Sequence, residues 1–211
     1  MQNDILIDSS CFDTAKENMD YDSTLLRQSQ QIQKVQYRLY SWVKPSVTFS
    51  YHSDLVEDLL TIDWSRRMTG GGIVFHCPDD VLLTVVCPFE KGSVKAYLLR
   101  WAQLLQTVYL KQGVEVSLGG GQSVLNRQFC QTYKSPYEGF FEGQKLWGMA
   151  VRKFKRSLLL HLIFHLGNGA VFNHLLDEYR SFLPSVDDNG LSLERVLLLS
   201  DLKNAMINAK F

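Results

Sequence analysis

Strand-like segments follow one another along this chain without a helix between each pair. Short runs rich in β-branched and aromatic residues recur, several of them separated by only a few residues. These runs are 35–43, 47–51, 73–76, 81–87, 114–118, 137–142, 145–151 and 158–164. A doubly wound parallel sheet would instead alternate strands with helices one by one. The pattern therefore predicts an α+β fold with a central mixed, largely antiparallel sheet.

Helical patterns are fewer, and the clearest covers 94–112. Apolar residues recur there at three- and four-residue steps, and Gly113 follows the end of the segment. Segment 13–33 contains neither glycine nor proline and is also expected to be helical. Further helices are expected over 55–62, about 170–179 and 192–209.

The composition excludes several classes of protein. The 22 Lys and Arg residues balance the 22 Asp and Glu residues, which argues against non-specific nucleic-acid binding. No apolar run reaches the roughly 20 residues of a membrane-spanning helix, and residues 1–4 do not resemble a secretory signal. The four cysteines lie far apart, without metal-ligand spacing. We therefore expect a cytoplasmic protein with no structural metal, no nucleic-acid partner and no membrane partner.

Positive charge is concentrated in residues 134–156, which contain six basic and two acidic residues. Residues 1–24 show the reverse, with six acidic residues and one lysine. A basic stretch is usually a solvated face, but it can also hold an anionic ligand or an acidic partner.

Residues 66–76 form the most informative run, which reads Arg-Arg-Met-Thr-Gly-Gly-Gly-Ile-Val-Phe-His. Its three glycines permit positive φ angles and a close approach of a ligand to the backbone. Arg66 and Arg67 precede them and are suited to phosphate or carboxylate oxygens. A strand-like run follows, which excludes a nucleoside-triphosphate P-loop. From glycine content alone, a flexible turn with solvated arginines is the better explanation.

Four segments taken together resemble the lipoate–protein ligase and octanoyltransferase family. Residues 66–76 match its motif Arg-Arg-x-Ser/Thr-Gly-Gly-x-x-Val-x-His. Residues 143–150, Gly-Gln-Lys-Leu-Trp-Gly-Met-Ala, are similar to Gly-x-Lys-x-x-Gly-Ser-Ala. His161 follows that alanine by eleven positions, as in the family. Residues 37–45 resemble the family's early strand, which reads Leu-Arg-x-Tyr-x-Trp before a proline. The segments have the family's order and spacing.

The resemblance implies a mixed sheet flanked by helices, with an acyl chain in a tunnel beneath the glycine loop. It implies a single catalytic domain over residues 1–211, without the C-terminal accessory domain that ligases often carry. The implied activity is attachment of lipoate or octanoate to one lysine of a lipoyl domain. The implied partners are the acyltransferase subunits of 2-oxoacid dehydrogenases and the H protein of glycine cleavage. The implied acyl- and adenylate-binding residues are Arg66, Arg67, Thr69, Gly70, Gly71, Gly72, His76, Gly148, Ala150 and His161.

Lys145 is the implied catalytic residue, because the family places this lysine beside the acyl carbonyl. The role also makes chemical sense. Attack of an amine on an activated acyl group puts negative charge on the carbonyl oxygen, and a preorganised cation stabilises that charge. Without Gly143 and Gly148 around it, an ordinary surface lysine would be the better interpretation.

Cys130 distinguishes two mechanisms. A ligase, our first expectation, activates free lipoate with ATP and Mg²⁺ and needs no cysteine. A cysteine-type octanoyltransferase takes the acyl group from acyl carrier protein onto a thiol that precedes a Tyr-Glu pair by seven residues, as Cys130 precedes Tyr137-Glu138. Gly72 matches the ligase form, since these transferases usually have arginine there. An inert, buried cysteine is the third interpretation.

Four residues depart from the family pattern. Ser50 stands at a usual glycine, and Cys77 stands where aspartate often follows the histidine. Met149 replaces the usual serine, and Leu162 replaces a glycine. We expect the bulkier residues at 149 and 162 to shorten the acyl tunnel. If the departures abolish catalysis, the alternative is a non-catalytic protein that binds lipoyl domains or an acyl ligand.

Overall fold

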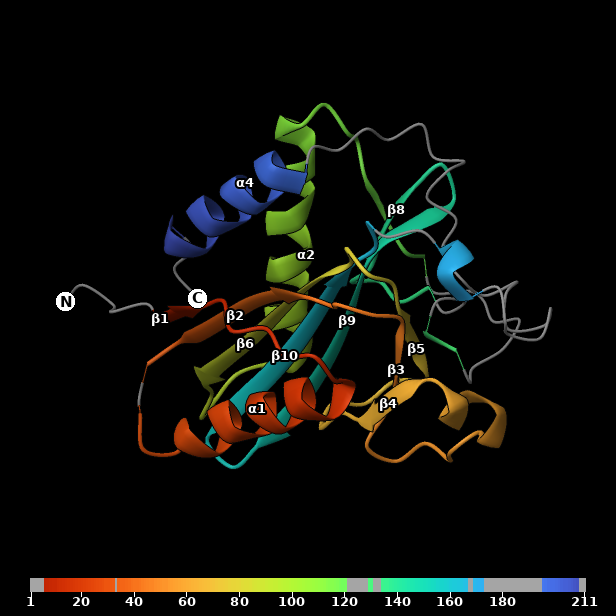
Figure 1. Cartoon of the computed structure of the whole chain (residues 1–211). Coiled ribbons are helices and arrows are strands. Elements are labelled where there is room, and N and C mark those ends of the chain that lie inside the picture. The colour runs from red at the N-terminus through yellow and green to blue at the C-terminus, as the bar shows by residue number, and fades with distance from the viewer. Residues whose placement is uncertain are drawn as a thin grey trace.

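The computed structural model describes residues 6–32, 34–120, 129–130, 134–166, 169–172 and 195–208. It contains a seven-stranded sheet with helices on both faces and a smaller three-stranded sheet at one end (Figure 1). The expected helix 170–179 lies mostly outside the described residues, which include only a short 3₁₀ turn, η3 (Gly169–Phe172). Within the described ranges, no helix has the length and apolar character needed to cross a membrane.

The large sheet has the strand order β1-β2-β6-β10-β9-β8-β7. Its strands are β1 (Leu6–Asp8), β2 (Gln36–Ser41), β6 (Val81–Pro88), β7 (Ser117–Leu118), β8 (Gly139–Phe141), β9 (Gln144–Phe154) and β10 (Ser157–Phe164). Strands β1 and β2 are parallel, and the other neighbours in this order are antiparallel. The predicted α+β fold with a mixed, largely antiparallel sheet is therefore confirmed.

The small sheet carries the glycine loop. Its order is β4 (Asp63–Arg66), β3 (Ser46–Phe49) and β5 (Val74–His76), with β3 parallel to β4 and antiparallel to β5. The sequence pattern did not predict β4, because its four residues are mostly polar and lack a strand-like run. Residues 67–73 connect the two outer strands of this sheet, so the glycine loop crosses the end of β3.

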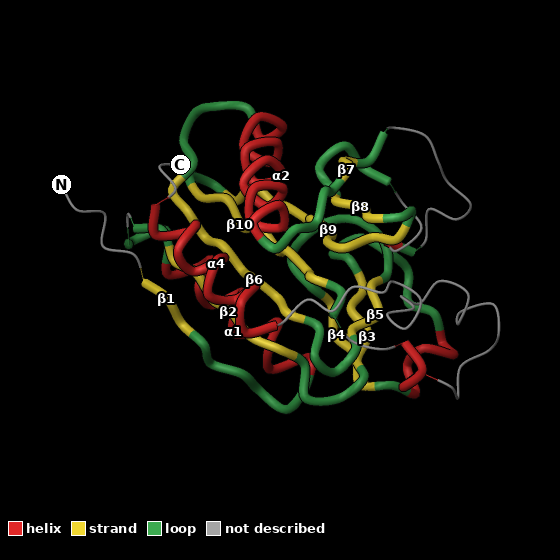
Figure 2. The backbone as a smooth tube through the Cα atoms, turned by 90° about the horizontal axis from the view of Figure 1, so that it is seen from above, coloured by secondary structure: helices red, strands yellow, loops and turns green. Residues whose placement is uncertain are grey.

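Helices cover both faces of the large sheet (Figures 1 and 2). Helix α1 (Ala15–Gln28) lies on one face, and α2 (Val94–Lys111) and α4 (Arg195–Asn208) lie on the other. A capping box between Thr14 and Glu17 begins α1. The apolar stripe predicted for 94–112 packs into the core beneath α2. The helix expected over 55–62 is only a 3₁₀ segment, η1 (Glu57–Thr61).

Strand alternation divides the side chains of β10 between the two faces. Leu158, Leu160 and Leu162 belong to the cluster that includes α2 and α4. Ile163 belongs to a separate cluster with residues of α1. His161 also faces α1, since its ring contacts Asp22 of that helix. The candidate site described below lies on this α1 face.

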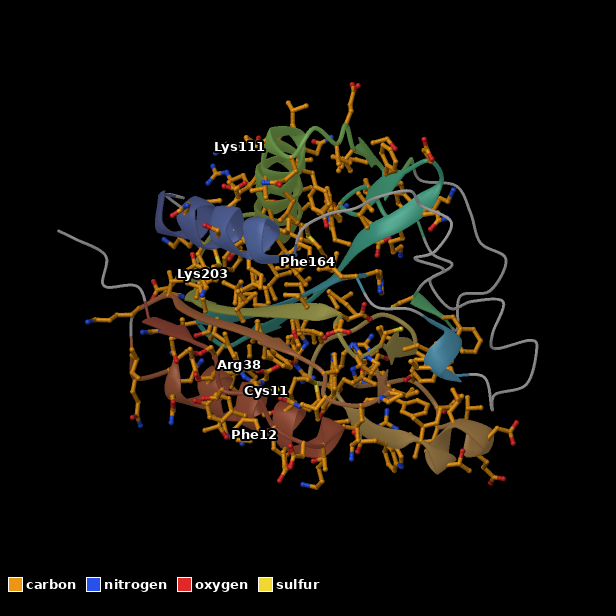
Figure 3. The ribbon with its side chains drawn as sticks, turned by 45° about the horizontal axis from the view of Figure 1, so that its top comes forward. Cys11, Phe12, Arg38, Lys111, Phe164 and Lys203 are labelled. Atoms are coloured by element: carbon orange, nitrogen blue, oxygen red, sulfur yellow. The ribbon has the colours of Figure 1, made fainter. Side chains whose placement is uncertain are left out.

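A buried ion pair fastens α1 to the sheet. Arg38 of β2 donates to Asp22 Oδ1 at 2.7 Å and to the carbonyl oxygen of Asn18 at 3.0 Å. The side chains of Arg38 and Asp22 are at most 1% exposed. Figure 3 shows Arg38 on the α1 side of the sheet, away from Lys111 of α2 and Lys203 of α4.

Candidate active site

A cavity lies between the α1 face of the large sheet and the segment that carries the glycine loop. Apolar side chains from four elements border it, namely Met19 of α1, Val74 of β5, Leu82 of β6 and Ile163 of β10. Its polar border includes Arg67, Cys130, Glu138, Lys145 and three histidines, His76, His161 and His165. The cavity therefore combines an apolar surface with a group of basic, acidic and nucleophilic side chains.

Lys145 brings a buried ammonium group to this cavity. It lies on β9 directly after the hairpin turn at Gly143, which has a φ of +82°. Its Nζ donates to the carbonyl oxygen of Cys130 at 2.6 Å and lies 3.0 Å from Glu138 Oε2. The side chain is 7% exposed. Both contacts fix the ammonium in position within the cavity wall.

Glu138 is a site residue that the sequence offered only as part of a Tyr-Glu pair. Besides the contact with Lys145, its Oε2 accepts a hydrogen bond from the backbone N–H of Ser135 at 2.8 Å. Burial raises the pKa of Glu138 above its ordinary value, while the charge of Lys145 opposes this shift. Glu138 and Lys145 are seven residues apart, a separation that does not by itself predict an ion pair. They meet because β8 and β9 form a hairpin.

Cys130 lies against the glycine loop. The backbone N–H of Gly72 donates to its Sγ at 3.0 Å, and Arg67 Nη2 lies 3.8 Å from the same sulfur. The N–H of Cys130 in turn donates to the carbonyl of Ile73 at 2.8 Å. The residue is partly exposed and borders the cavity. Its sulfur therefore has two donors within hydrogen-bond distance, the Gly72 N–H and Arg67 Nη2.

Arg67 binds the backbone of the glycine loop. Its Nη2 donates to the carbonyl oxygens of Gly70 at 2.9 Å and Gly72 at 2.6 Å. Burial lowers the pKa of Arg67 from its usual value. Gly71 has a φ of +96°, and a Cβ at this position would lie 3.0 Å from Cys130 Sγ and 3.2 Å from Arg67 Nη2. Only glycine fits there, both for conformation and for space.

The two arginines of the motif have different structural roles. Arg66 is exposed and donates to the carbonyl oxygens of Ser50 at 2.8 Å and Ser53 at 2.7 Å. It therefore supports the neighbouring loop, and it is absent from the described lining of the cavity. Ser50, one of the family departures, accepts from the N–H of Ser53 and belongs to the same loop.

His76 is buried at the end of β5. Its Nε2 is hydrogen-bonded to Thr48 Oγ1 at 2.7 Å, and its ring stacks on Trp42 with a centroid distance of 4.2 Å. Burial, followed by the charge of Arg67, lowers the pKa of His76 well below its ordinary value. His76 is therefore a neutral side chain at physiological pH.

His161 connects the glycine loop to α1. Its Nδ1 is hydrogen-bonded to Thr69 Oγ1 at 3.1 Å, and its Nε2 lies 3.1 Å from Asp22 Oδ2. Burial opposes ionisation of Asp22, but the contact with His161 and the charge of Arg38 outweigh it and lower its pKa. Sequence analysis missed Asp22, because nothing in the acidic segment 1–24 indicates which acid is buried.

Met149 and Leu162 are cross-strand partners on β9 and β10. Both border the cavity, but their side chains pack in the cluster beneath α2, on the opposite face of the sheet from His161. The positions that face the cavity side are their neighbours Gly148 and Ala150. A Cβ at Gly148 would lie 3.6 Å from Glu138 Oε1. The structure thus gives no support for a tunnel shortened by the side chains at 149 and 162.

Two other sequence features lie away from the cavity. Cys77 is fully buried in the core of the small sheet, and burial raises its pKa. Within the basic stretch, Lys153, Lys155 and Arg156 lie at the turn between β9 and β10, at the other end of β9 from Lys145. The stretch therefore does not gather its charge around one site.

The family model of the lipoyl protein ligase A/B catalytic domain matches residues 14–206. The fold and the cavity thus belong to a catalytic domain that handles acyl groups. The chain is a member of the lipoyl protein ligase A/B catalytic domain family, and it is an enzyme that attaches lipoyl groups to proteins. Of the alternatives open on sequence alone, family membership favours an enzyme over a non-catalytic binding protein.

Solved structures share the fold. A lipoate-protein ligase A bound with ATP has a TM-score of 0.74 and 18% identity, covering 98% of this chain and 84% of that one. Protein Ta0514 from T. acidophilum with bound lipoic acid has a TM-score of 0.74 and 17% identity, covering 95% and 84%. A bi-partite lipoate protein ligase with its E2 lipoyl domain from Thermoplasma acidophilum has a TM-score of 0.71 and 18% identity, covering 98% and 82%. A comparison with curated proteins found no match.

Proposed function

We propose that this enzyme transfers a lipoyl or octanoyl group from an activated acyl donor to one lysine of a lipoyl domain. The observation that carries the proposal is the buried Lys145 ammonium in a cavity with apolar walls. The acyl chain would occupy the apolar part, bordered by Met19, Leu82 and Ile163. Relatives of the same fold that contain lipoic acid, ATP or an E2 lipoyl domain support the choice of substrates.

Lys145 would act on the acyl carbonyl. When the acceptor amine attacks, the carbonyl oxygen becomes negatively charged, and an ammonium within hydrogen-bond distance stabilises it. Glu138 and the carbonyl of Cys130 already hold Lys145 Nζ in place, so little reorganisation is needed during the reaction. A buried cation is also more effective than one in water, because the local dielectric constant is lower.

In the ligase form of the reaction, the free acid would attack ATP to give an acyl adenylate and pyrophosphate, and the amine would then displace AMP. A magnesium ion would accompany the phosphates of ATP, as Mg²⁺ commonly does. The acceptors we propose are lipoyl domains of 2-oxoacid dehydrogenase acyltransferase subunits and the glycine cleavage H protein.

The transferase form is the second candidate, and the surroundings of Cys130 favour it. The Gly72 N–H and Arg67 Nη2 both lie within hydrogen-bond distance of Sγ, which borders the cavity. Attack of this sulfur on octanoyl-acyl carrier protein would form a Cys130 thioester and release the carrier thiol. The acceptor lysine would then form the amide and regenerate the Cys130 thiol.

Intact mass of an isolated lipoyl domain tests the proposal. The domain is incubated with the enzyme and either lipoate, ATP and Mg²⁺ or octanoyl-acyl carrier protein. We expect a gain of one acyl group with at least one of the two donors. No gain with either donor would contradict the proposed function.

Cys130→Ser then separates the two forms. If the donor is the carrier-bound acyl group, we expect transfer to fall on the order of 10³-fold, because the hydroxyl is a much weaker nucleophile. A ligase keeps its activity with lipoate and ATP. The matched control is Cys11→Ser, since Cys11 is an exposed cysteine that is absent from the described lining of the cavity. An octanoyl adduct on Cys130 of the wild-type enzyme would support the transferase directly.

A further inference from the structure

A chain of buried polar groups runs from α1 to the beginning of the glycine loop. It consists of Asp22, His161 and Thr69, which are 1%, 7% and 0% exposed. The described lining of the cavity includes His161 but neither Asp22 nor Thr69. Thr69 and the three loop glycines are all absent from this lining, although the family motif places them among the acyl- and adenylate-binding residues. Thr69 Oγ1 is hydrogen-bonded to His161 Nδ1.

The carboxylate of Asp22 lies between the sheet and His161. Arg38 Nη1 donates to Oδ1 at 2.7 Å, and Thr84 Oγ1 donates to Oδ2 at 2.9 Å. His161 Nε2 lies 3.1 Å from the same Oδ2. The other ring nitrogen, Nδ1, is hydrogen-bonded to Thr69 Oγ1 at 3.1 Å, so the imidazole connects Asp22 to Thr69.

The glycine loop is consequently held at two points. The His161 contact holds Thr69 at its start, and Arg67 binds the carbonyl oxygens of Gly70 and Gly72. Between these points the N–H of Gly72 is directed at Cys130 Sγ on the cavity wall. A shift of the loop would lengthen this hydrogen bond and move the donor relative to the cavity wall.

We propose that Asp22, His161 and Thr69 form a positioning relay that holds the Gly72 N–H on Cys130 Sγ, at the wall of the cavity proposed for acyl transfer. Asp22 and Thr69 act through His161 and touch no substrate, so they are positioning residues. The inference rests on the proposed function, because it assigns these residues a part in acyl transfer. It extends that function to helix α1, which carries Asp22.

The first test compares Thr69→Val with Thr69→Ser in acyl transfer to an isolated lipoyl domain, using the donor that the wild-type enzyme accepts. Valine keeps the shape and removes the hydroxyl, so we expect kcat to fall about 10- to 100-fold with the KM for the donor unchanged within about twofold. Serine keeps the hydroxyl and should restore kcat to within about threefold of wild type. Rescue by serine distinguishes a hydrogen bond from simple packing.

Ser29→Ala is the matched control. Ser29 also has a fully buried hydroxyl, bonded to Leu26 O and Ser157 Oγ at the C-terminal end of α1, and neither His161 nor Thr69 is among its described hydrogen-bond partners. We expect it to lose stability and keep kcat. The relay is wrong if folded Thr69→Val keeps kcat, or if Thr69→Ser is as impaired as Thr69→Val.

A second readout needs neither substrate nor turnover. In ¹⁵N-histidine NMR spectra, the Nδ1 signal of His161 should report its hydrogen bond to Thr69. Thr69→Val should shift the Nδ1 signal and leave Nε2 unchanged. An Nδ1 signal that stays the same in Thr69→Val would overturn the relay. This readout does not depend on acyl transfer. A failure of the relay can therefore be distinguished from a failure of the proposed function.

Discussion

At the scale of single residues, the account depends on the ammonium of Lys145. We expect Lys145→Ala to lower acyl transfer on the order of 10²- to 10³-fold, because the carbonyl oxygen loses its stabilising cation. Glu138 then becomes an unpaired buried carboxylate, so some loss of stability is also expected. The control is Lys134→Ala, since Lys134 is an exposed lysine on the preceding segment. A folded Lys145→Ala enzyme with full activity would contradict the proposed role of Lys145 at the acyl carbonyl.

Gly71 is restricted by both its backbone conformation and its neighbours, so a side chain there should be less well tolerated than at Gly70. Gly71→Ala combines an unfavourable φ of +96° with a Cβ against Cys130 and Arg67, so we expect it to cost about 1–3 kcal/mol of stability. Transfer activity should fall with it, because the loop must move. Gly70→Ala is the comparison, since a Cβ there meets nothing within 4 Å. Equal thermal unfolding temperatures for the two variants would contradict this prediction.

At the scale of elements, the attachment of α1 to β2 makes stability depend on pH. Asp22 has a lowered pKa in the folded enzyme, whereas the unfolded chain takes up the proton near the ordinary 3.8. Its contribution is therefore complete above that pH and is lost as the pH falls from 3.8 through the lower folded value. Urea unfolding at pH 6, 4 and 3 measures this loss.

Asp22→Asn should flatten that dependence and cost about 3 kcal/mol at neutral pH, since Arg38 loses its charged partner. Asp20→Asn, an exposed position on the same helix, should behave like the wild type. If Asp22→Asn loses stability on acidification as steeply as the wild type, another carboxyl group controls the acid transition.

At the scale of the whole molecule, the sequence predicted what periodicity and motif spacing encode. The repeat of apolar residues identified α2, the run of β-branched residues identified β6, and the apolar run 158–164 identified β10. The sequence pattern missed β1 and β4, because each is only three or four residues long and is stabilised by pairing with another strand. Strand β4 is also mostly polar and gives little local signal.

The same limit applies to the site. The motifs located Lys145, Cys130 and the glycine loop, but Asp22 joins them only through the packing of α1 on the sheet. Strand alternation could have shown that His161 and Leu162 face opposite sides of β10. Only the structure shows which of those sides contains the cavity.

The most direct test of the account is a crystal structure of the enzyme with a non-hydrolysable acyl-sulfamoyl adenosine analogue. We predict that the acyl chain lies on the α1 face between Met19 and Ile163, with its carbonyl oxygen within hydrogen-bond distance of Lys145 Nζ. An acyl carbonyl bound elsewhere, with Lys145 still paired only to Glu138 and Cys130, would contradict the central claim.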